Sequence, residues 1–288
     1  MSPINHLRFP ILFLCTVLAC VTWTCKETPS TVSPDNGTTF PLAAGTRWTY
    51  VSRDTAIHIV PDSLAQYAWV KQLVDTTKRF VSLEILRRQL LHDTLDTYVC
   101  QEVDSSEPGP VLTSQYYYAN RDSGLYLYAR SGEYHAGLLP FSTFPQVHRL
   151  SREAYSTNRR HIPMSVLQDF LRDVGLSDTL YETSPRQALK YPMTVGQEWI
   201  YRPSPSGLSR RIVALENVSV PAGVFLCYKI QTTIEDYPGV ELFDFLSEKG
   251  LIKRSLLIRS FSITTPDGPE VLGVYDLLRE TNLVSVTQ

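Results

Sequence analysis

The sequence predicts a mainly β protein, in which two related antiparallel β units form a curved sheet or open barrel with one connecting α-helix. Three observations lead to this prediction. An 11-residue segment occurs twice, strand-length apolar stretches alternate with turn residues, and the composition is rich in residues that favour strands and turns. The chain of 288 residues contains 16 Tyr, 11 Phe and 19 Pro, and 43% of it is hydrophobic, which is typical of a globular protein.

The duplicated segment spans residues 40–50 and 191–201, and it marks the start of each predicted unit. Both copies read aromatic, Pro, apolar, two spacers, Gly, two spacers, Trp, one spacer, Tyr. The shared positions are Pro41, Gly45, Trp48 and Tyr50 in the first copy, and Pro192, Gly196, Trp199 and Tyr201 in the second. A Gly permits a turn, and Trp and Tyr two residues apart lie on one face of a strand. The repeat therefore predicts two structural units of common design.

The N-terminus has the pattern of a bacterial lipoprotein signal peptide over residues 1–19. A short polar start is followed by an apolar stretch from Phe9 to Cys25, which is short for a membrane span of about 20 residues. Residues 17–20, Val-Leu-Ala-Cys, resemble a lipobox, so Cys20 is the expected lipidation site and Cys25 is the alternative. An ordinary cleaved signal peptide or an uncleaved anchor stays open. Lipidation would make the membrane a partner of this chain.

Residues 20–39 are predicted to form the lipidated N-terminus and a flexible tether, because they are rich in Thr, Ser, Pro and Gly. The first β unit is expected over residues 40–150. Its predicted strands are 56–60, 66–74, 80–91, 94–103, 111–119 and 125–130. A helix is the competing interpretation of residues 80–91, because Leu83, Leu86 and Leu90 have helical spacing.

A helical connector is expected over residues 151–190. Residues 163–175 carry one apolar stripe at helical spacing, with Ser165 as a possible cap and Gly175 at the end. The second β unit is expected over residues 191–288. Its predicted strands are 208–220, 224–234, 240–246, 251–263 and 271–286.

The order of four motifs resembles a family of bacterial envelope lipoproteins whose domain has no known function. The motifs are the two copies of the repeat, residues 218–225 (Val-Ser-Val-Pro-Ala-Gly-Val-Phe) and residues 250–253 (Gly-Leu-Ile-Lys). The resemblance covers most of residues 40–288, but the helix and the long middle loop poorly. It implies a curved antiparallel sheet distantly like that of LolA and LolB, and it implies no catalytic residues.

Motifs that carry chemistry are not found in the sequence. It has no nucleophile elbow, no His-Glu-x-x-His, no phosphate-binding loop and no Cys-x-x-Cys. The six His residues show no metal-ligand spacing, so we expect no metal and no cofactor. Glu241, Asp244 and Glu248 are predicted to lie on a solvated strand face. A net charge of −2 does not favour nucleic acid as a partner.

Two groups of side chains leave alternatives open. Cys100 and Cys227 could form a disulfide, which an envelope compartment permits, or could be two free buried thiols. Tyr116, Tyr118, Tyr126 and Tyr128 could form a ligand-facing aromatic strip, or could pack in the core. Alternation along a strand places Tyr116 and Tyr118 on the face opposite to Tyr117.

The functional hypothesis is a lipid-anchored, non-enzymatic protein of the bacterial cell envelope, facing the periplasm or the surface. Its curved sheet would bind an apolar ligand such as a lipid, or a partner segment. The alternative is a scaffold or assembly lipoprotein that docks a partner protein on an edge strand. An envelope hydrolase whose residues assemble from distant strands is a third possibility.

Overall fold

The computed structural model describes residues 39–67, 77–106, 111–132, 179–203, 207–235, 238–264 and 271–288. These residues form one antiparallel sheet and a short 3₁₀ helix, η1 (Asp62–Gln66). The strands are β1 (Arg47–Val60), β2 (Thr77–Leu91), β3 (Leu95–Ser106), β4 (Val111–Arg121), β5 (Gly124–Gly132), β6 (Leu180–Lys190), β7 (Glu198–Arg202), β8 (Leu208–Val220), β9 (Gly223–Ile234), β10 (Val240–Ser247), β11 (Gly250–Thr264) and β12 (Val271–Thr287). Within these ranges no helix has the length and apolar character needed to cross a bilayer.

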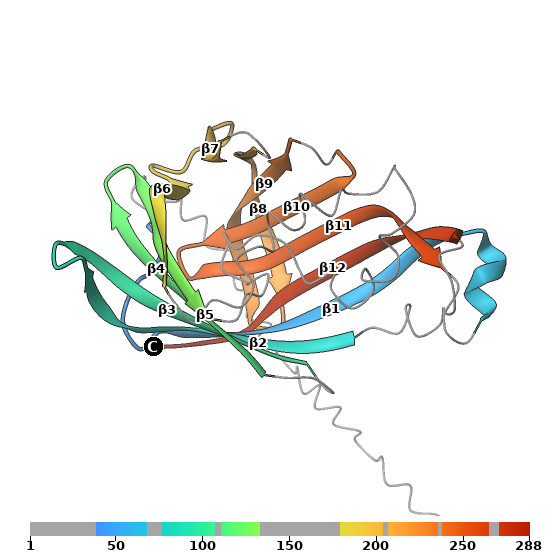
Figure 1. The fold of residues 1–288 in the computed structure, drawn as a ribbon, viewed down its shortest axis with the longest axis horizontal. Coiled ribbons are helices and arrows are strands. Elements are labelled where there is room, and N and C mark those ends of the chain that lie inside the picture. The colour runs from blue at the N-terminus through green and yellow to red at the C-terminus, as the bar shows by residue number, and fades with distance from the viewer. Residues whose placement is uncertain are drawn as a thin grey trace, which may run out of the picture. The chain divides into compact units, whose positions relative to one another are not determined.

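The sheet joins two six-stranded meanders. Its order is β6-β5-β4-β3-β2-β1-β12-β11-β10-β9-β8-β7, so strands that follow one another within each half are paired. The first and last strands, β1 and β12, pair along most of their length and connect the halves (Figure 1). The structure is therefore mainly β and antiparallel, as predicted, but the halves form one continuous sheet that is nearly closed into a barrel.

The two edge strands, β6 and β7, follow one another in the chain and meet at a seam without a backbone ladder between the described residues. Side chains connect them instead. The indole Nε1 of Trp199 donates a hydrogen bond to the carbonyl of Gln187 at 3.0 Å, and Nη1 of Arg210 donates to the carbonyl of Ala188 at 3.0 Å. These bonds occupy two carbonyls near the end of β6, so the seam is held by side chains of β7 and β8.

The predicted hairpins are confirmed, because their signals are local. Strands β2 and β3 turn at His92 and Asp93, which both have positive φ, and β4 and β5, β8 and β9, and β10 and β11 also pair as expected. Residues 180–190, expected inside the helical connector, form β6 and pair with β5. The helix predicted over residues 163–175, most of the strand predicted over 66–74, and both candidate lipidation cysteines lie outside the described residues.

The two repeat segments make matching turns before β1 and β7. Gly45 and Gly196 have φ values of +88° and +91°, a region that favours glycine. The amide of Gly45 donates to the carbonyl of Ile85, and the amide of Gly196 donates to the carbonyl of Ile212, both at 2.7 Å. Each turn thus fixes the register of its strand against the next one.

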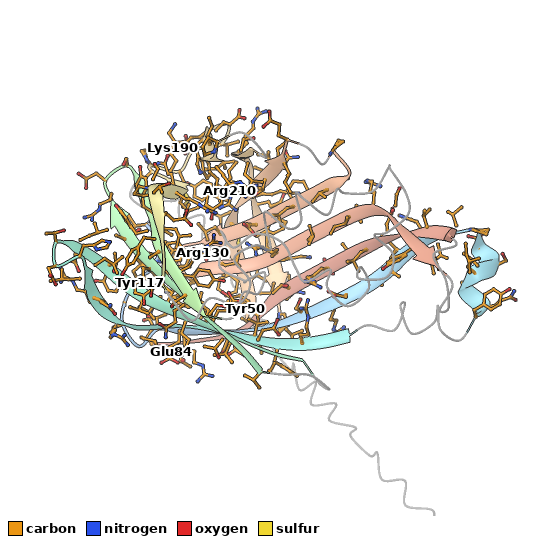
Figure 2. The ribbon with its side chains drawn as sticks, in the orientation of Figure 1. Tyr50, Glu84, Tyr117, Arg130, Lys190 and Arg210 are labelled. Atoms are coloured by element: carbon orange, nitrogen blue, oxygen red, sulfur yellow. The ribbon has the colours of Figure 1, made fainter. Side chains whose placement is uncertain are left out.

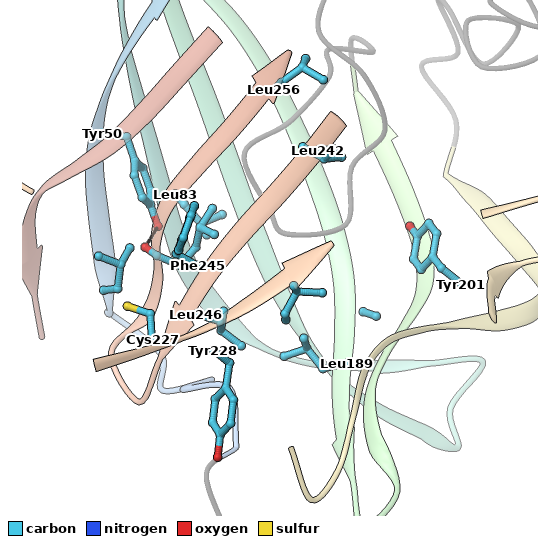
Figure 3. Close-up of a cluster of buried hydrophobic side chains, with 14 of the residues drawn as sticks. Tyr50, Leu83, Leu189, Tyr201, Cys227, Tyr228, Leu242, Phe245, Leu246 and Leu256 are labelled. Carbon is cyan, nitrogen blue, oxygen red and sulfur yellow. Dashed lines mark hydrogen bonds between the residues drawn. The ribbon is translucent and has the colours of Figure 1, made fainter. Parts of the chain in front are cut away.

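Side chains from all twelve strands converge in one apolar cluster on one face of the sheet, here called the inner face. A flat sheet of twelve strands would be roughly 50 Å wide, so a single cluster requires strong curvature. Figure 3 shows part of it, including Tyr50 of β1, Leu189 of β6 and Tyr201 of β7. A smaller cluster around Val99 and Tyr117 lies on the opposite, outer face of β2 to β5.

Trp48 and Trp199 are both buried in the inner cluster and both donate from Nε1 to a backbone carbonyl. We expect Trp48→Ala and Trp199→Ala each to lower the free energy of unfolding by about 3–5 kcal/mol, because each leaves a large cavity and an unpaired carbonyl. Chemical denaturation measures this. The control is Ile200→Ala, since Ile200 in β7 is 67% exposed. An unchanged midpoint for either Trp variant would contradict its role in the core.

Candidate functional site

Charged side chains occupy the inner face in two separate groups. The first, called the central cluster, consists of Arg210, Asp244 and Arg254 on β8, β10 and β11. The second, called the charge ladder, consists of Asp104, Arg79, Asp54 and Arg279 on the neighbouring strands β3, β2, β1 and β12. Burying charges is costly unless they are paired, so the completeness of the pairing indicates what each group does.

In the central cluster every charge is closely paired. The Asp244 carboxylate accepts hydrogen bonds from Nη2 of Arg210 and, at 2.7 Å, from Nε of Arg254. Arg210 also donates to the hydroxyl of Thr232 at 3.2 Å and reaches across the seam to β6. Arg210, labelled in Figure 2, is buried, with 2% of its surface exposed. This cluster therefore ties β8, β10 and β11 to β6.

The burial of Asp244 corrects the prediction of a solvated strand face. Its side chain has no exposed surface, whereas Glu241 and Glu248 are accessible, with side-chain exposures of 40% and 75%. Strand β10 has a register shift between Phe245 and Leu246, and Asp244 faces inward just before it. Alternation alone places Asp244 on the face opposite to Glu241. Of its two arginines, Arg254 is its register partner across the β10–β11 hairpin, and Arg210 comes from the more distant strand β8.

Tyr50, near the start of β1, lies beside the central cluster. Its hydroxyl donates to the carbonyl of Leu251 at 3.0 Å. Burial raises the pKa of this hydroxyl far above its ordinary value, and the charge of Glu102 on β3 adds to the shift. Glu102 also raises the pKa of Arg254 on β11, although β3 and β11 are four strands apart in the sheet. The charge of Glu102 therefore acts on both Tyr50 and Arg254.

The charge ladder alternates in sign across four strands. Arg279 holds both carboxylate oxygens of its register partner Asp54 in a two-pronged hydrogen bond. Arg79 lies between the two acids, with Nη2 at 3.5 Å from Asp54 Oδ1 and Nη1 at 3.5 Å from Asp104 Oδ2. The side chains of Arg79 and Asp104 are each 14% exposed, and that of Asp54 is 23% exposed. The ladder is thus looser and more accessible than the central cluster.

The two aspartates of the ladder have opposite pKa shifts. Burial acts to raise the pKa of Asp54, but the hydrogen bonds and charge of Arg279, together with Arg79, bring it below its ordinary value of 3.8. Burial raises the pKa of Asp104, and Arg79 and Arg279 offset this only in part. The fold therefore favours the ionised form of Asp54 and disfavours that of Asp104.

The four tyrosines predicted as a ligand-facing strip lie on two faces. Tyr116 and Tyr118 are buried in the inner cluster, with ring centroids 6.3 Å apart. Tyr128 packs against the outer cluster around Tyr117, and its ring centroid is 6.4 Å from that of Tyr126. The register shift between Tyr117 and Tyr118 against β5 accompanies this division. The structure therefore does not bring the four rings onto one surface.

Cys100 and Cys227 are free and buried, which is the second of the two alternatives. Each thiol has a carbonyl of its own strand as its hydrogen-bond partner, Tyr98 and Phe225 respectively. Burial raises the pKa of the Cys100 thiol well above its ordinary value and that of Cys227 to about 12. Among the described residues no group of three or more His, Cys, Asp or Glu side chains could hold a metal ion.

Sequence reasoning missed the charge ladder because its members are far apart in the chain. Asp54 and Arg279 are separated by 225 residues, and each looks like an ordinary surface charge in its own strand. One signal was available. Asp54 has the same parity along β1 as Trp48 and Tyr50, which the repeat already assigned to one face, so alternation predicts an inward charge there.

Replacement of Asp244 should destabilise the protein strongly. Asp244→Asn leaves two buried arginines without their shared carboxylate, and we expect the free energy of unfolding to fall by about 3–5 kcal/mol. The control is Glu241→Gln in the same strand, whose exposed pair with Arg259 should contribute less than about 1 kcal/mol. Denaturant titration of both variants measures the difference. Equal effects would show that the central cluster is not structural.

Replacing each ladder aspartate by asparagine should affect stability differently at the two positions. Asp54→Asn removes a carboxylate whose ionised form the fold stabilises, so at pH 7 it should cost about 1–3 kcal/mol. This stabilisation is present above the unfolded-state pKa near 3.8 and is lost as the pH falls below it, so the deficit should shrink in acid. Asp104→Asn removes a charge that the fold disfavours, so at pH 7 it should melt no lower than the wild type. Melting curves from pH 3 to pH 7 test both.

Comparisons with known proteins give little beyond the structure itself. No family model matches the chain, and no curated protein matches it. Similar solved structures include a candidate exported protein with a YmcC-like fold from Bacteroides fragilis NCTC 9343, at 10% identity and a TM-score of 0.36, covering 87% of this chain and 99% of that one. Another is a candidate lipoprotein from Parabacteroides distasonis ATCC 8503, at 11% identity and a TM-score of 0.33, covering 86% and 97%. At such scores neither likeness supports an argument, and the expected likeness to LolA and LolB is not shown.

Proposed function

We propose that this chain is a lipid-anchored, non-catalytic protein of the bacterial cell envelope that binds an amphiphilic ligand on the inner face of its curved sheet. One observation carries the proposal. The inner face places a partly exposed charge ladder directly beside apolar side chains. In register, Asp104 pairs with Val81, and Arg279 pairs with Leu256. Both apolar side chains are buried, so the ladder is a partly exposed polar site at the border of the apolar core. Such a border suits a molecule with a polar head and an apolar part.

The ladder changes the ligand expected from the sequence. A purely apolar ligand would cover Asp54, Arg79 and Asp104 without offering hydrogen bonds, and covering charges in this way is costly. A purely polar ligand would make no use of the apolar core that borders the ladder. An amphiphile avoids both penalties, which favours it over the wholly apolar ligand of the original hypothesis.

The chemistry of the buried groups supports a binding role over a catalytic one. The thiols of Cys100 and Cys227 and the hydroxyl of Tyr50 have raised pKa values, which makes them poor nucleophiles at neutral pH. The carboxylates of Asp54 and Asp244 each contact two arginines, which makes them poor general bases.

Two further parts of the proposal rest on sequence and local geometry. The lipobox-like residues 17–20 support an anchor at Cys20, with the folded body on a tether of residues 20–39. The matching turns at Gly45 and Gly196, each followed by a buried Trp, support descent of the two halves from one duplicated unit.

Docking of a partner strand on a sheet edge is the less favoured alternative. The edges are β6 and β7, and Ile200 of β7 exposes a large apolar surface. However, Pro185 lies within β6 and has no amide hydrogen to donate, a common protection of edge strands. Strand β7 has only five residues, which offers a short template.

Membrane fractionation and solvent extraction of the full chain test the proposal together. We expect the wild type and Cys25→Ala to sediment with membranes and Cys20→Ala to be released, because only Cys20 would carry the lipid. After purification in detergent, all three should yield a non-covalently bound amphiphile on organic extraction, since binding depends on the sheet. Release of the Cys25→Ala variant from the membrane fraction would instead identify Cys25 as the lipidated residue. Absence of any extracted amphiphile from all three would contradict the binding function.

A further inference from the structure

The two charged groups on the inner face use the same residue types but differ in how completely they are paired. Side chains of the central cluster are 0–9% exposed, and Asp244 is held by direct hydrogen bonds from two arginines. In the ladder, only the pair of Asp54 and Arg279 is as close. Both contacts of Arg79 are 3.5 Å long. The charges of the central cluster are therefore held by short hydrogen bonds within the fold, whereas Arg79 and Asp104 of the ladder are not.

Two ladder atoms are buried without a hydrogen-bond partner in the part of the chain that the structure describes. They are Nε of Arg79 and Oδ1 of Asp104. Buried polar atoms are nearly always paired, and an unpaired atom of a charged group is especially costly. These two atoms belong to one ion pair, since Arg79 Nη1 lies 3.5 Å from Asp104 Oδ2. The pair thus contains one unpaired donor and one unpaired acceptor.

The polarity of the two atoms defines the ligand. Arg79 Nε can only donate a hydrogen bond and favours an anion, whereas an ionised Asp104 Oδ1 can only accept and favours a cation. The ladder has two Arg and two Asp, so its formal charge is zero and a ligand with a net charge gains no advantage. We propose that the ladder binds a zwitterion that joins an ammonium group, placed at Asp104, to a phosphate group, placed at Arg79.

The neighbouring side chains fit an ammonium-phosphate headgroup that belongs to a lipid. Val81 and Leu256 are buried on the same face in register with Asp104 and Arg279, so the ladder borders the apolar core of the sheet, and hydrocarbon joined to the headgroup would lie next to that core. The inference deepens the proposed function and rests on it. A free phosphate ester with an amino group has the same headgroup chemistry without the hydrocarbon.

The energetics of Asp104 agree with a binding role. Its raised pKa means that the fold disfavours the charge at this position, so the side chain reduces stability at neutral pH. A buried charge that costs stability is typical of functional sites, where binding a ligand supplies the missing partner. Asp244, with two close arginines, has no such deficit of partners.

Calorimetric titration of the full chain in a nonionic detergent tests the inference. The probes are dihexanoyl phosphatidylethanolamine, dihexanoyl phosphatidylglycerol and the water-soluble diester glycerophosphoethanolamine, with both lipids below their micelle concentrations. We expect the ethanolamine lipid to bind about tenfold more tightly than the glycerol lipid, because only it carries an ammonium group. Asp104→Asn should remove this preference, and Arg79→Gln should weaken both lipids. Glu241→Gln, on the outer face of β10, should retain the wild-type pattern.

Each outcome separates the headgroup inference from the proposed function. Equal affinity of the wild type for both lipids would overturn the zwitterion site and leave amphiphile binding intact. No binding of either lipid would overturn both. Glycerophosphoethanolamine binding as tightly as the ethanolamine lipid would support the zwitterion site and assign it to a soluble ester. Because Asp104→Asn is expected to melt no lower than the wild type, a melting curve excludes unfolding as the cause of a lost preference.

Discussion

The whole sheet depends on closing its inner face at the seam of β6 and β7, whose described residues form no backbone ladder with one another. At the other junction, β1 and β12 share a long backbone register, and side-chain bonds such as those of Arg279 to Asp54 reinforce it. At the seam, Trp199 and Arg210 bond the carbonyls of Gln187 and Ala188 instead. Arg210 is buried there against the carboxylate of Asp244, which it shares with Arg254. Closure of the sheet thus depends on buried ion pairs and hydrogen bonds as well as on apolar packing.

Much of the strand order within each half could be predicted from the sequence, because hairpin signals are local. Turn residues such as His92-Asp93 and Pro221-Ala222 separate stretches of alternating apolar residues, and all of these hairpins form. The union of the two halves could not be predicted, because it depends on pairing residues near 50 with residues near 280. Strand β6 was missed for another reason: Pro185 and six polar residues hide its alternation.

The candidate site was less predictable than the fold. The many tyrosines of β4 and β5 suggested a ligand-facing strip. In the structure Tyr116 and Tyr118 pack in the core, and Tyr128 lies on the outer face. The residues that distinguish the inner face are ordinary Asp and Arg side chains, whose meaning depends on which strand lies next to them. Local patterns report the face of a residue but not its neighbours, so they can place Asp54 inward and cannot supply Arg279.

The contrast between the two charged groups separates structure from function on one surface. If buried charges served only to close the sheet, selection for stability would drive the ladder towards the close pairing seen around Asp244. Arg79 instead divides its contacts between two aspartates at 3.5 Å, and Asp104 keeps a carboxylate oxygen without a partner among the described residues. An Asn at position 104 would fill the same volume without the cost of the charge. A carboxylate held at this cost, next to apolar side chains, therefore points to a partner other than the residues that the structure describes.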